Sequence, residues 1–570
     1  MKRTVVQYRG KEIIKNQEFI VEIEDLTTEG AGVAKLDGYA LFIKGALIGD
    51  KARVSIMKTK KNYGYARLVE ILEPSKDRIE PACSMARKCG GCQLQHLRYE
   101  TQLSYKQNKI ATCLERIGGF QQIPMEPIMG MEEPYYYRNK AQFPVGRDKN
   151  GALVTGFYAG HTHNIVDISH CMIQAKENDT LLALVREYME ECGVSTYDEN
   201  SHTGLVRHIL TRVGFATKQV MVCLIINGDK LPRQEVLLEK LSNVPGMTNI
   251  SINKNKEKTN RILGEQCETL WGKAYIEDYI GDIKYQISPL SFFQVNPVQT
   301  TKLYQTALEY ADLKGDEIVW DLYCGIGTIS LFLAQKAKQV YGVEIVPQAI
   351  EDARKNAVLN HMSNAEFFVG AAEEILPAKY AESNGTMAAD VIVVDPPRKG
   401  CDEALLDTII KMHPEKVVYV SCDPATLARD LNVLCRNGYQ LRRVRGCDMF
   451  PQSFHVETVV MLSHKKPDSV INVKVEFGED EGKVPLDNIA KRAEAYKPKE
   501  RVTYKMIKEY IEAKYGFKVH TAYIAGVKRD LGLPMYDAPN AVEELKQPRK
   551  HPMVEKVEAI KDALKYFEII

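Results

Sequence analysis

The alternation of apolar and polar positions divides the chain into regions with different periods. Between residues 14 and 74, stretches such as FIVEIEDL and YARLVEIL alternate apolar and polar side chains, which is typical of short strands with one buried face. Glycines separate these stretches as turns. Residues 14–74 are therefore predicted to form a small β-barrel of the OB type, a common oligonucleotide-binding fold.

A different pattern runs from residue 286 to 465. Apolar runs such as EIVWDLY and DVIVVD alternate with helical stretches such as TISLFLAQKA and PQAIEDARKNAVLN. This order predicts a doubly wound, Rossmann-like α/β domain with a parallel sheet. Residues 93–124 are assigned to the same domain, and residues 93–120 within them are predicted to form a helix with Leu103, Ile110 and Leu114 on its apolar stripe.

Two further regions complete the predicted organisation. Residues 75–92 and 125–285 indicate a central α/β region, with strands such as GLVRHILTRVG and QVMVCLIING. Past residue 466 the composition becomes rich in lysine and glutamate, and two helical patterns follow, KMIKEYIEAKYG and VEKVEAIKDALKYF. Residues 466–570 are predicted to be a C-terminal helical accessory segment whose role the sequence does not give.

Composition narrows the class of protein. With 45% hydrophobic and 26% charged residues, the chain is an ordinary globular sequence of 570 residues. The start of the chain lacks a signal peptide and no apolar run is long enough for a membrane span, so a cytoplasmic protein without a membrane is expected. A net charge of +1 excludes a histone-like binder but allows a local basic surface. The 13 cysteines favour metal-binding or catalytic roles over disulfides.

The segment DLYCGIGT indicates a nucleotide-like cofactor site. Gly325 and Gly327 follow a predicted strand and allow the backbone to approach a ligand at a helix N-terminus. Glu344 ends the next strand, at a position that usually binds ribose hydroxyls, and Asp395 precedes two prolines at the end of another strand. NAD is the competing cofactor, but the glycine spacing is not G-x-G-x-x-G, and the DPP element favours S-adenosylmethionine.

Cys422 is the candidate nucleophile. The strand KVVYVS places it at the carboxyl end of the sheet, where open α/β sheets bind their ligands. The alternative is a buried structural cysteine, which is the more common fate of this residue type. A base should lie nearby, and Glu457, in the segment FHVET, is the candidate, although a surface glutamate in a hairpin is the simpler interpretation of that residue.

The segments SPLSFFQVN, DLYCGIGT, VVDPPRKG, VSCDPATLARDL and FHVET together resemble the RNA uracil-5-methyltransferases, over residues 14–465. The resemblance implies that Cys422 adds to C6 of a uracil ring, which activates C5 for methylation, and that Glu457 removes the C5 proton. It also implies four residues that bind S-adenosyl-L-methionine: Gln294, Tyr323, Glu344 and Asp395.

Several residues are candidates for RNA contact. Residues 14–74 resemble a TRAM domain, an RNA-binding module, and mix cations with aromatic residues as single-stranded RNA binding requires. Phe292 is a candidate to stack on an RNA base, and two basic segments look like RNA-facing surface by the same resemblance. The predicted contacts are Phe292, Arg138, Lys140, Arg207, His208, Lys60 and Tyr63.

A group of cysteines adds a candidate metal centre. Cys83, Cys89 and Cys92 have the spacing C-x5-C-x2-C, and Cys171 lies in the later segment ISHCMIQ. Four thiolates could hold zinc or a [4Fe–4S] cluster. The segment CGGCQLQH resembles the iron–sulfur motif of ribosomal RNA uracil methyltransferases with a TRAM domain, which favours [4Fe–4S] over the zinc alternative.

The resemblance implies methylation of uridine C5 in large-subunit (23S) ribosomal RNA, giving 5-methyluridine. Two alternatives stay open, a transfer RNA uracil-5-methyltransferase and a non-catalytic RNA-binding or ribosome-assembly factor. Intact candidate residues Cys422 and Glu457 argue against the non-catalytic alternative. The sequence indicates no protein partner, and the tail from residue 466 has no counterpart in the family core.

Overall fold

The computed structural model describes residues 5–8, 11–160, 162–464, 504–531 and 554–567. The chain divides into two compact units, Met1–Val470 and Ile471–Ile570, and each is described by itself. Among the described residues, no helix has both the length and the apolar character that a membrane-crossing helix requires.

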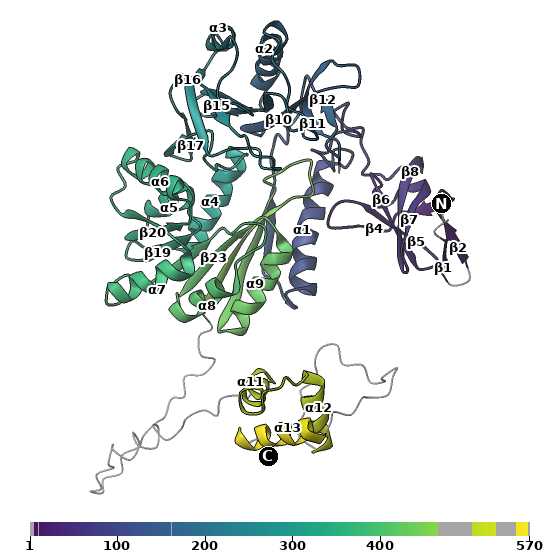
Figure 1. Ribbon diagram of the computed structural model, residues 1–570, viewed down its shortest axis with the longest axis vertical. Coiled ribbons are helices and arrows are strands. Elements are labelled where there is room, and N and C mark those ends of the chain that lie inside the picture. The colour runs from purple at the N-terminus through teal and green to yellow at the C-terminus, as the bar shows by residue number, and fades with distance from the viewer. Residues whose placement is uncertain (1–4, 9–10, 161, 465–503, 532–553, 568–570) are drawn as a thin grey trace. The chain divides into compact units, whose positions relative to one another are not determined.

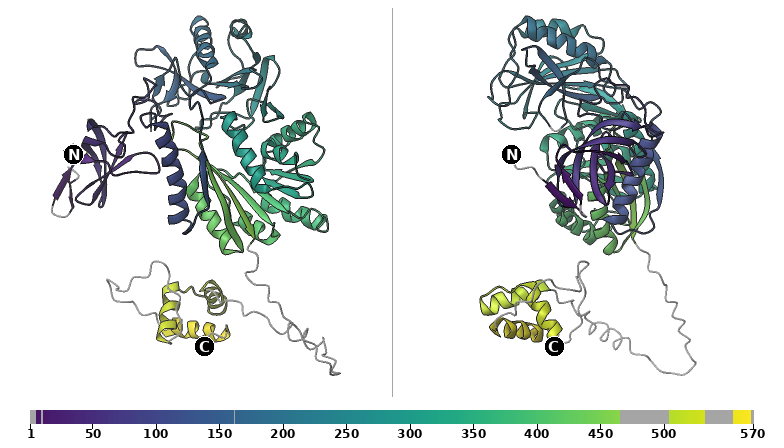
Figure 2. Two further views of the ribbon diagram at one scale, coloured as in Figure 1. Left: turned by 180° about the vertical axis from the view of Figure 1, so that it is seen from behind. Right: turned by 90° about the vertical axis from the view of Figure 1, so that its right-hand side faces the viewer.

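The N-terminal strands form the predicted barrel (Figure 2). Its sheet has the order β3-β7-β8-β6-β5-β4, and a short hairpin of β1 and β2 precedes it. In β6, Tyr39, Leu41 and Ile43 are fully buried and alternate with partly exposed residues, as a strand with one face in a core requires. The strands are β1 (Val5–Tyr8), β2 (Lys11–Ile14), β3 (Glu18–Glu22), β4 (Asp25–Leu26), β5 (Gly32–Leu36), β6 (Tyr39–Lys44), β7 (Lys51–Thr59) and β8 (Tyr63–Glu73).

The central region is built on a seven-stranded sheet of order β12-β11-β10-β13-β14-β15-β16. Only β14 and β15 run parallel; the other neighbours are antiparallel. Helices α2 (Glu177–Glu191) and α3 (Gln234–Ser242) accompany it. The strands are β10 (Lys140–Arg147), β11 (Leu153–Tyr158), β12 (Ile165–Asp167), β13 (Val206–Val213), β14 (Val220–Ile226), β15 (Met247–Lys254) and β16 (Gln266–Gly272).

Strand β14 shows why the sequence of the central region contains continuous apolar runs. All seven of its residues are buried, because the sheet is covered on both faces. Val222 and Leu224 join the core under α2 and α3. The alternate residues Met221 and Cys223 join the core of the following α/β domain.

The α/β domain contains an eight-stranded sheet of order β21-β20-β19-β22-β23-β25-β24-β9 (Figure 1). The five strands from β21 to β23 in this order are parallel, and β25 is antiparallel to both of its neighbours. The strands are β9 (Met125–Met129), β19 (Ile318–Leu322), β20 (Gln339–Glu344), β21 (Ala365–Val369), β22 (Val391–Val394), β23 (Lys416–Ser421), β24 (Tyr439–Cys447) and β25 (Glu457–His464).

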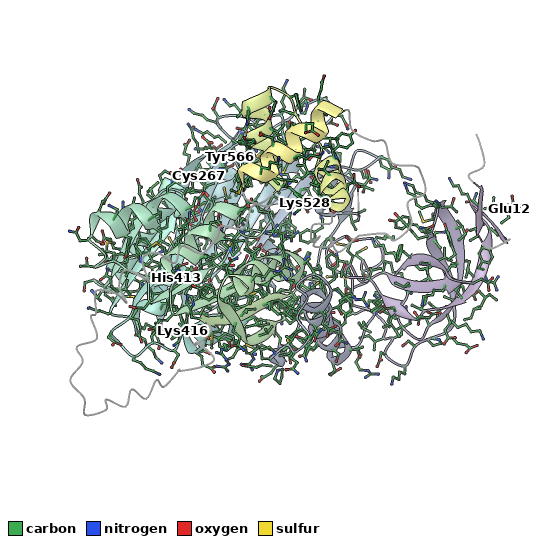
Figure 3. All side chains as sticks on the ribbon, turned by 90° about the horizontal axis from the view of Figure 1, so that it is seen from below. Glu12, Cys267, His413, Lys416, Lys528 and Tyr566 are labelled. Atoms are coloured by element: carbon green, nitrogen blue, oxygen red, sulfur yellow. The ribbon has the colours of Figure 1, made fainter. Side chains whose placement is uncertain are left out.

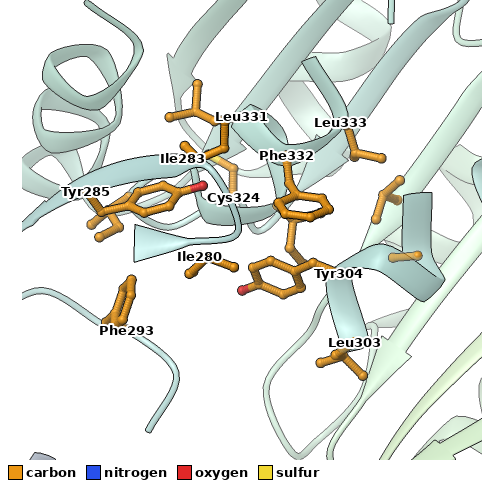
Figure 4. Packing of buried hydrophobic residues seen from close by; sticks show 14 of the residues in the cluster. Ile280, Ile283, Tyr285, Phe293, Leu303, Tyr304, Cys324, Leu331, Phe332 and Leu333 are labelled. Atoms are coloured by element: carbon orange, nitrogen blue, oxygen red, sulfur yellow. The ribbon is translucent and has the colours of Figure 1, made fainter. Parts of the chain in front are cut away.

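Helices cover both faces of this sheet. One face carries α4, α5 and α6 with a hairpin of β17 (Ile276–Ile280) and β18 (Ile283–Ile287), and the other carries α1, α7, α8 and α9. Figure 4 shows Tyr304, Phe332 and Leu303 in the first of these cores. The helices are α1 (Tyr99–Arg116), α4 (Pro297–Ala311), α5 (Thr328–Ala334), α6 (Pro347–Leu359), α7 (Ala372–Glu382), α8 (Glu403–Met412) and α9 (Pro424–Arg436).

The order of the strands positions a ligand crevice. Connections from β19 lead toward β20 and β21, whereas β22 and β23 lie on the other side of β19, so the chain reverses direction between β19 and β22. Loops that leave the carboxyl ends of two such strands diverge and open a crevice. The predicted doubly wound sheet is confirmed, and its binding edge is where β19, β22 and β23 end.

In its described residues, the C-terminal unit has the helices α11 (Tyr504–Tyr515), α12 (Thr521–Asp530) and α13 (Val554–Tyr566). They share an apolar core that includes Ile511, Ile524 and Ile560. The other residues predicted as part of the accessory segment, 466–503 and 532–553, lie outside the described residues.

Candidate active site

Cys422 lies directly after β23 and before α9. Asp423 caps that helix, because its side chain accepts hydrogen bonds from the N–H groups of Ala425 at 2.9 Å and Thr426 at 3.1 Å. The short turn holds Cys422 at the carboxyl end of the strand. Lys416 begins the same strand at its opposite end, where Figure 3 labels it near His413.

Glu457 is the first residue of β25, the strand beside β23. Ser421 pairs with Thr458 in this antiparallel register, so the next residues at that end are Cys422 and Glu457. Glu457 is only 3% exposed, which excludes the simpler interpretation of a surface glutamate. The two candidate catalytic residues are therefore neighbours at one sheet edge.

The electrostatic surroundings of this pair are acidic. Burial, together with the carboxyl groups of Glu457 and Asp395, raises the pKa of the Cys422 thiol to about 12, and Arg398 opposes this shift. Burial also raises the pKa of Glu457 to about 8, with Asp395 acting in the same direction and Arg398 against it. Arg398, which the sequence analysis missed, follows the DPP element and is the cation that acts on both groups.

Asp321 and Asp395 lie on either side of the strand reversal. Burial raises the pKa of Asp321 to about 7, and burial together with Asp321 raises the pKa of Asp395 to about 7. Ser330 donates a hydrogen bond to one oxygen of Asp321 at 2.5 Å, and the other oxygen is buried without a partner among the described residues. Such a set of carboxyl groups favours a positively charged ligand.

The glycine loop after β19 is linked to Glu344 at the end of β20. The Glu344 carboxylate accepts hydrogen bonds from the N–H groups of Gly325 at 3.3 Å and Val346 at 3.0 Å. Tyr323 has a φ of 87°, a left-handed conformation that is costly for a residue with a side chain. The loop is thus fixed close to the acidic residue that the sequence assigned to ribose binding.

The segment that contains Gln294 is held by the central sheet. Asn139 donates its side-chain amide to the Gln294 carbonyl at 3.0 Å and its N–H to the Val295 carbonyl at 2.8 Å. Phe293 packs on Tyr285 with ring centres 6.0 Å apart (Figure 4). Phe292 is 69% exposed, so its ring is free for the stacking role that the sequence predicts.

The four predicted metal-binding cysteines line one cavity of about 390 Å³. Burial raises the pKa of Cys92 to about 12 and that of Cys171 to about 11, and the thiols influence one another. In the described parts of the chain, no three His, Cys, Asp or Glu side chains are arranged to hold a single metal ion. The cysteines thus surround a space instead of converging on a point.

Arg138 and Lys140 line this same cavity and are partly buried. Burial, together with the neighbouring Arg212 and Arg138, lowers the pKa of Lys140 to about 7. Both side chains are therefore less accessible than the open RNA-facing surface that the sequence predicts.

The prediction that Arg207 and His208 face RNA is wrong. Arg207 is 5% exposed, and its guanidinium donates to the carbonyls of Asn255, Glu257 and Thr259 at 2.7–3.0 Å. His208 is 6% exposed, and burial lowers its pKa to about 4. Both lie on β13, a strand inside the sheet.

The barrel candidates are accessible. Lys60 is exposed, and Tyr63 lies 5.6 Å from Phe42 and 5.8 Å from Tyr65 between ring centres. These rings form a small exposed aromatic group beside several lysines. Contact of Lys60 and Tyr63 with RNA stays a prediction.

Comparison with known proteins matches this architecture. A family model described as tRNA (Uracil-5-)-methyltransferase matches residues 98–465, and a TRAM domain model matches residues 15–69. An uncharacterized RNA methyltransferase of Halalkalibacterium halodurans is 52% identical over 452 residues, 79% of this chain and 98% of that protein. One from Clostridium tetani is 49% identical, with 79% and 97% covered.

A solved structure is also similar. It is the tRNA (uracil-54, C5)-methyltransferase of Pyrococcus abyssi in complex with S-adenosyl-L-homocysteine, with a TM-score of 0.62 and 28% identity. The match covers 78% of this chain and 100% of that one. The chain belongs to the RNA uracil-5-methyltransferase family, with a TRAM domain before its methyltransferase domain.

Proposed function

We propose that this protein methylates C5 of a uridine in RNA, with S-adenosylmethionine as the methyl donor and Cys422 as the covalent nucleophile. The observation that carries the proposal is the adjacency of Cys422, at the end of β23, and the buried Glu457, at the start of β25. A thiol beside a buried carboxyl group at a ligand-binding edge suits addition to a base followed by proton removal.

The proposed reaction is a series of bond changes that involve Cys422 and Glu457. The Cys422 thiolate forms a bond to C6 of the uracil ring, which makes C5 nucleophilic. C5 takes the methyl group, and Glu457 then accepts the C5 proton while the carbon–sulfur bond breaks. A carboxyl group with a pKa of about 8 is a much better base near neutral pH than an ordinary glutamate.

The acidic crevice supports the choice of methyl donor. S-adenosylmethionine, when bound, supplies an electrophilic methyl group on a positively charged sulfur. We assign its binding to Gln294, Tyr323, Glu344 and Asp395; Tyr323 and Glu344 lie at the glycine loop, and Asp395 follows β22 beside the strand reversal. The unpartnered oxygen of Asp321 offers a further acceptor for a cationic ligand. The Pyrococcus neighbour was solved with the demethylated form of this donor.

Large-subunit (23S) ribosomal RNA is the substrate class that we propose, because the barrel and the four-cysteine segment together resemble the ribosomal RNA enzymes. Transfer RNA is the second candidate, and the name of the Pyrococcus neighbour favours it. The test is incubation of purified protein with methyl-labelled donor and total RNA from cells that lack this enzyme. Label in 5-methyluridine of 23S RNA supports the proposal. Label in transfer RNA would instead show that transfer RNA is the substrate. RNA binding without any label would indicate a non-catalytic factor.

We further propose that Cys83, Cys89, Cys92 and Cys171 hold a [4Fe–4S] cluster. A zinc ion with Zn–S bonds of about 2.3 Å would draw four thiolates to about 3.8 Å from one another. The four cysteines line one cavity of about 390 Å³, and a cluster binds each thiolate at a different iron. The cations Arg138 and Lys140 suit an anionic group there. Metal analysis of anaerobically purified protein should find about four irons per chain, and stoichiometric zinc without iron would exclude the cluster.

The C-terminal unit is proposed to be an accessory RNA- or ribosome-contacting domain. The family model ends at residue 465, and the relatives are almost fully covered by 79% of this chain. Deletion of residues 467–570 is expected to leave binding of the methyl donor intact and to weaken RNA affinity or change site choice. Loss of donor binding would show that the unit is needed for the catalytic fold.

A further inference from the structure

One ion pair in the methyltransferase domain is completely enclosed. Lys106 of α1 and Asp448, just after β24, contact each other, and both side chains are 0% exposed. Lysine and aspartate are almost never fully buried unless they are paired. A buried ion pair often stabilises a protein no more than an apolar pair of the same size, so its presence calls for another explanation.

Both partners make further hydrogen bonds. Asp448 accepts a second hydrogen bond from the Tyr99 hydroxyl at 2.8 Å, and Lys106 also donates to the carbonyl of Phe450 at 3.0 Å. The N–H of Asp448 donates to the Met129 carbonyl at 2.9 Å. The pair thus fixes both the side chain and the backbone where the chain leaves β24.

The same face of α1 continues along the segment that follows. Gln102 and Gln452 exchange hydrogen bonds of 3.0 and 3.1 Å, and Lys109 donates to the Phe454 carbonyl at 3.1 Å. Positions 99, 102, 106 and 109 are three or four residues apart and share one side of a helix. A polar stripe of α1 therefore runs along residues 448–456, which we name the base segment.

The base segment connects β24 to the first residue of β25, which is Glu457. Other elements also hold it: Tyr137 donates its hydroxyl to the Pro451 carbonyl at 3.0 Å, and Asn296 donates to the Met449 carbonyl at 3.1 Å. Gln452 has a φ of 69°, so the segment contains a conformation that needs such support. Among the described residues, no hydrogen bond or ion pair joins these partners to Cys422 or to the crevice carboxyl groups.

We propose that Lys106 and Asp448 are positioning residues for the proposed base, holding the base segment so that the Glu457 carboxylate reaches C5 of the bound uracil. This inference rests on the proposed function. The pair acts through the backbone that leads into Glu457, and it should affect proton removal more than thiol addition or binding of the methyl donor. Small displacements of a catalytic group cost large factors in rate.

The test uses full-length Lys106→Met and the double variant Lys106→Met/Asp448→Asn, which leaves no unpaired buried charge. Each is mixed with labelled RNA and S-adenosylmethionine, and samples are run on a denaturing gel over time. Release of RNA from the covalent adduct is expected to slow by about tenfold or more, so that adduct accumulates. Affinity for the methyl donor and the rate of adduct formation should change much less.

A matched control is the buried ion pair Arg78–Asp50 at the barrel, with side chains 18% and 0% exposed. Arg78→Met/Asp50→Asn should lower thermal stability without slowing adduct release. Equal loss of donor binding, adduct formation and release in the Lys106 variants would mean a merely structural role and would overturn the inference. Absence of adduct even in Glu457→Gln would instead refute the proposed function, so the two failures are distinguishable.

Discussion

Two sites in the first unit gather ionisable side chains, and their charges are opposite. At the sheet edge, one thiol, Cys422, has Asp395 and Glu457 as its neighbours. In the cysteine cavity, four thiols have the cations Arg138 and Lys140 beside them. An acidic surrounding keeps a thiol protonated until a cation arrives, whereas a basic surrounding suits an anionic metal–thiolate group.

The difference shows how the same residue type acquires two uses. Cys422 ends a strand at a crevice, so a ligand can reach it and leave again. The cavity cysteines come from two distant segments and close around a space between them. The first arrangement suits turnover and the second suits permanent ligation. The variants below break or sharpen this contrast, in order of decreasing effect.

Removing the single thiol should have the largest effect. Cys422→Ala is expected to abolish both methyl transfer and any covalent RNA adduct, because no group remains to attack C6. Iron content and binding of the methyl donor should persist. Cys192→Ala, at a partly exposed cysteine outside both sites, is the matched control and should stay active. Uridine methylation by Cys422→Ala would refute the covalent mechanism.

Removing the base while keeping the thiol should stop the reaction at a later stage. Glu457→Gln can still form the methylated adduct, but proton removal should slow by about 10²–10⁴-fold. RNA should then accumulate as a denaturation-resistant adduct that depends on S-adenosylmethionine, measured on a denaturing gel. Normal turnover of this variant would show that another group, such as His455, is the base.

The acidic edge should also give a distinctive pH profile. Both the Cys422 thiol and the Glu457 carboxyl must lose a proton, and their pKa values are raised to about 12 and about 8. Below pH 8, the logarithm of the rate at which RNA is released from the methylated adduct should therefore rise with pH, with a slope about one greater than in Glu457→Gln. Equal slopes in the two proteins would mean that Glu457 does not titrate in the reaction.

A substitution in the cysteine cavity should have little effect on binding of the methyl donor at the catalytic sheet edge. Cys89→Ser is expected to lose iron and thermal stability, because one of four thiolates is missing. Binding of the methyl donor should persist, since Glu344 and Asp395 lie on the other sheet. Iron analysis and calorimetric titration with the donor check this prediction. Loss of donor binding with the iron would show that the two sites are not separate.

The sequence could locate the catalytic edge because each of its motifs is local. Glu344 ends a strand, and Cys422 and Asp395 each follow one; parallel strands bring their carboxyl ends together. The sequence could not predict that Glu457 is buried, because its burial depends on the pairing of β25 with β23 and β24. The prediction that Arg207 is accessible to RNA failed for the same reason, because a charged residue in a strand is expected to be exposed unless the neighbouring strands are known.

Helix α1 shows a second limit of pattern reading. The sequence predicts a helix over residues 93–120 from its apolar stripe alone, whereas in the structure the helix begins at Tyr99. Its polar stripe is also buried, at Gln102 and Lys106, because it lies along a segment more than 300 positions later in the chain. Periodicity reports which face is apolar and gives no information on polar contacts so distant in sequence.

The separate core of the C-terminal helices has a thermodynamic consequence. Ile511, Ile524 and Ile560 are shielded by their own unit, and the first unit has its own cores. Two cores that do not share side chains can melt independently, so cooperativity ends at the boundary between them. A single melting temperature or unfolding free energy is therefore not defined for this chain, and calorimetry should be analysed as two transitions.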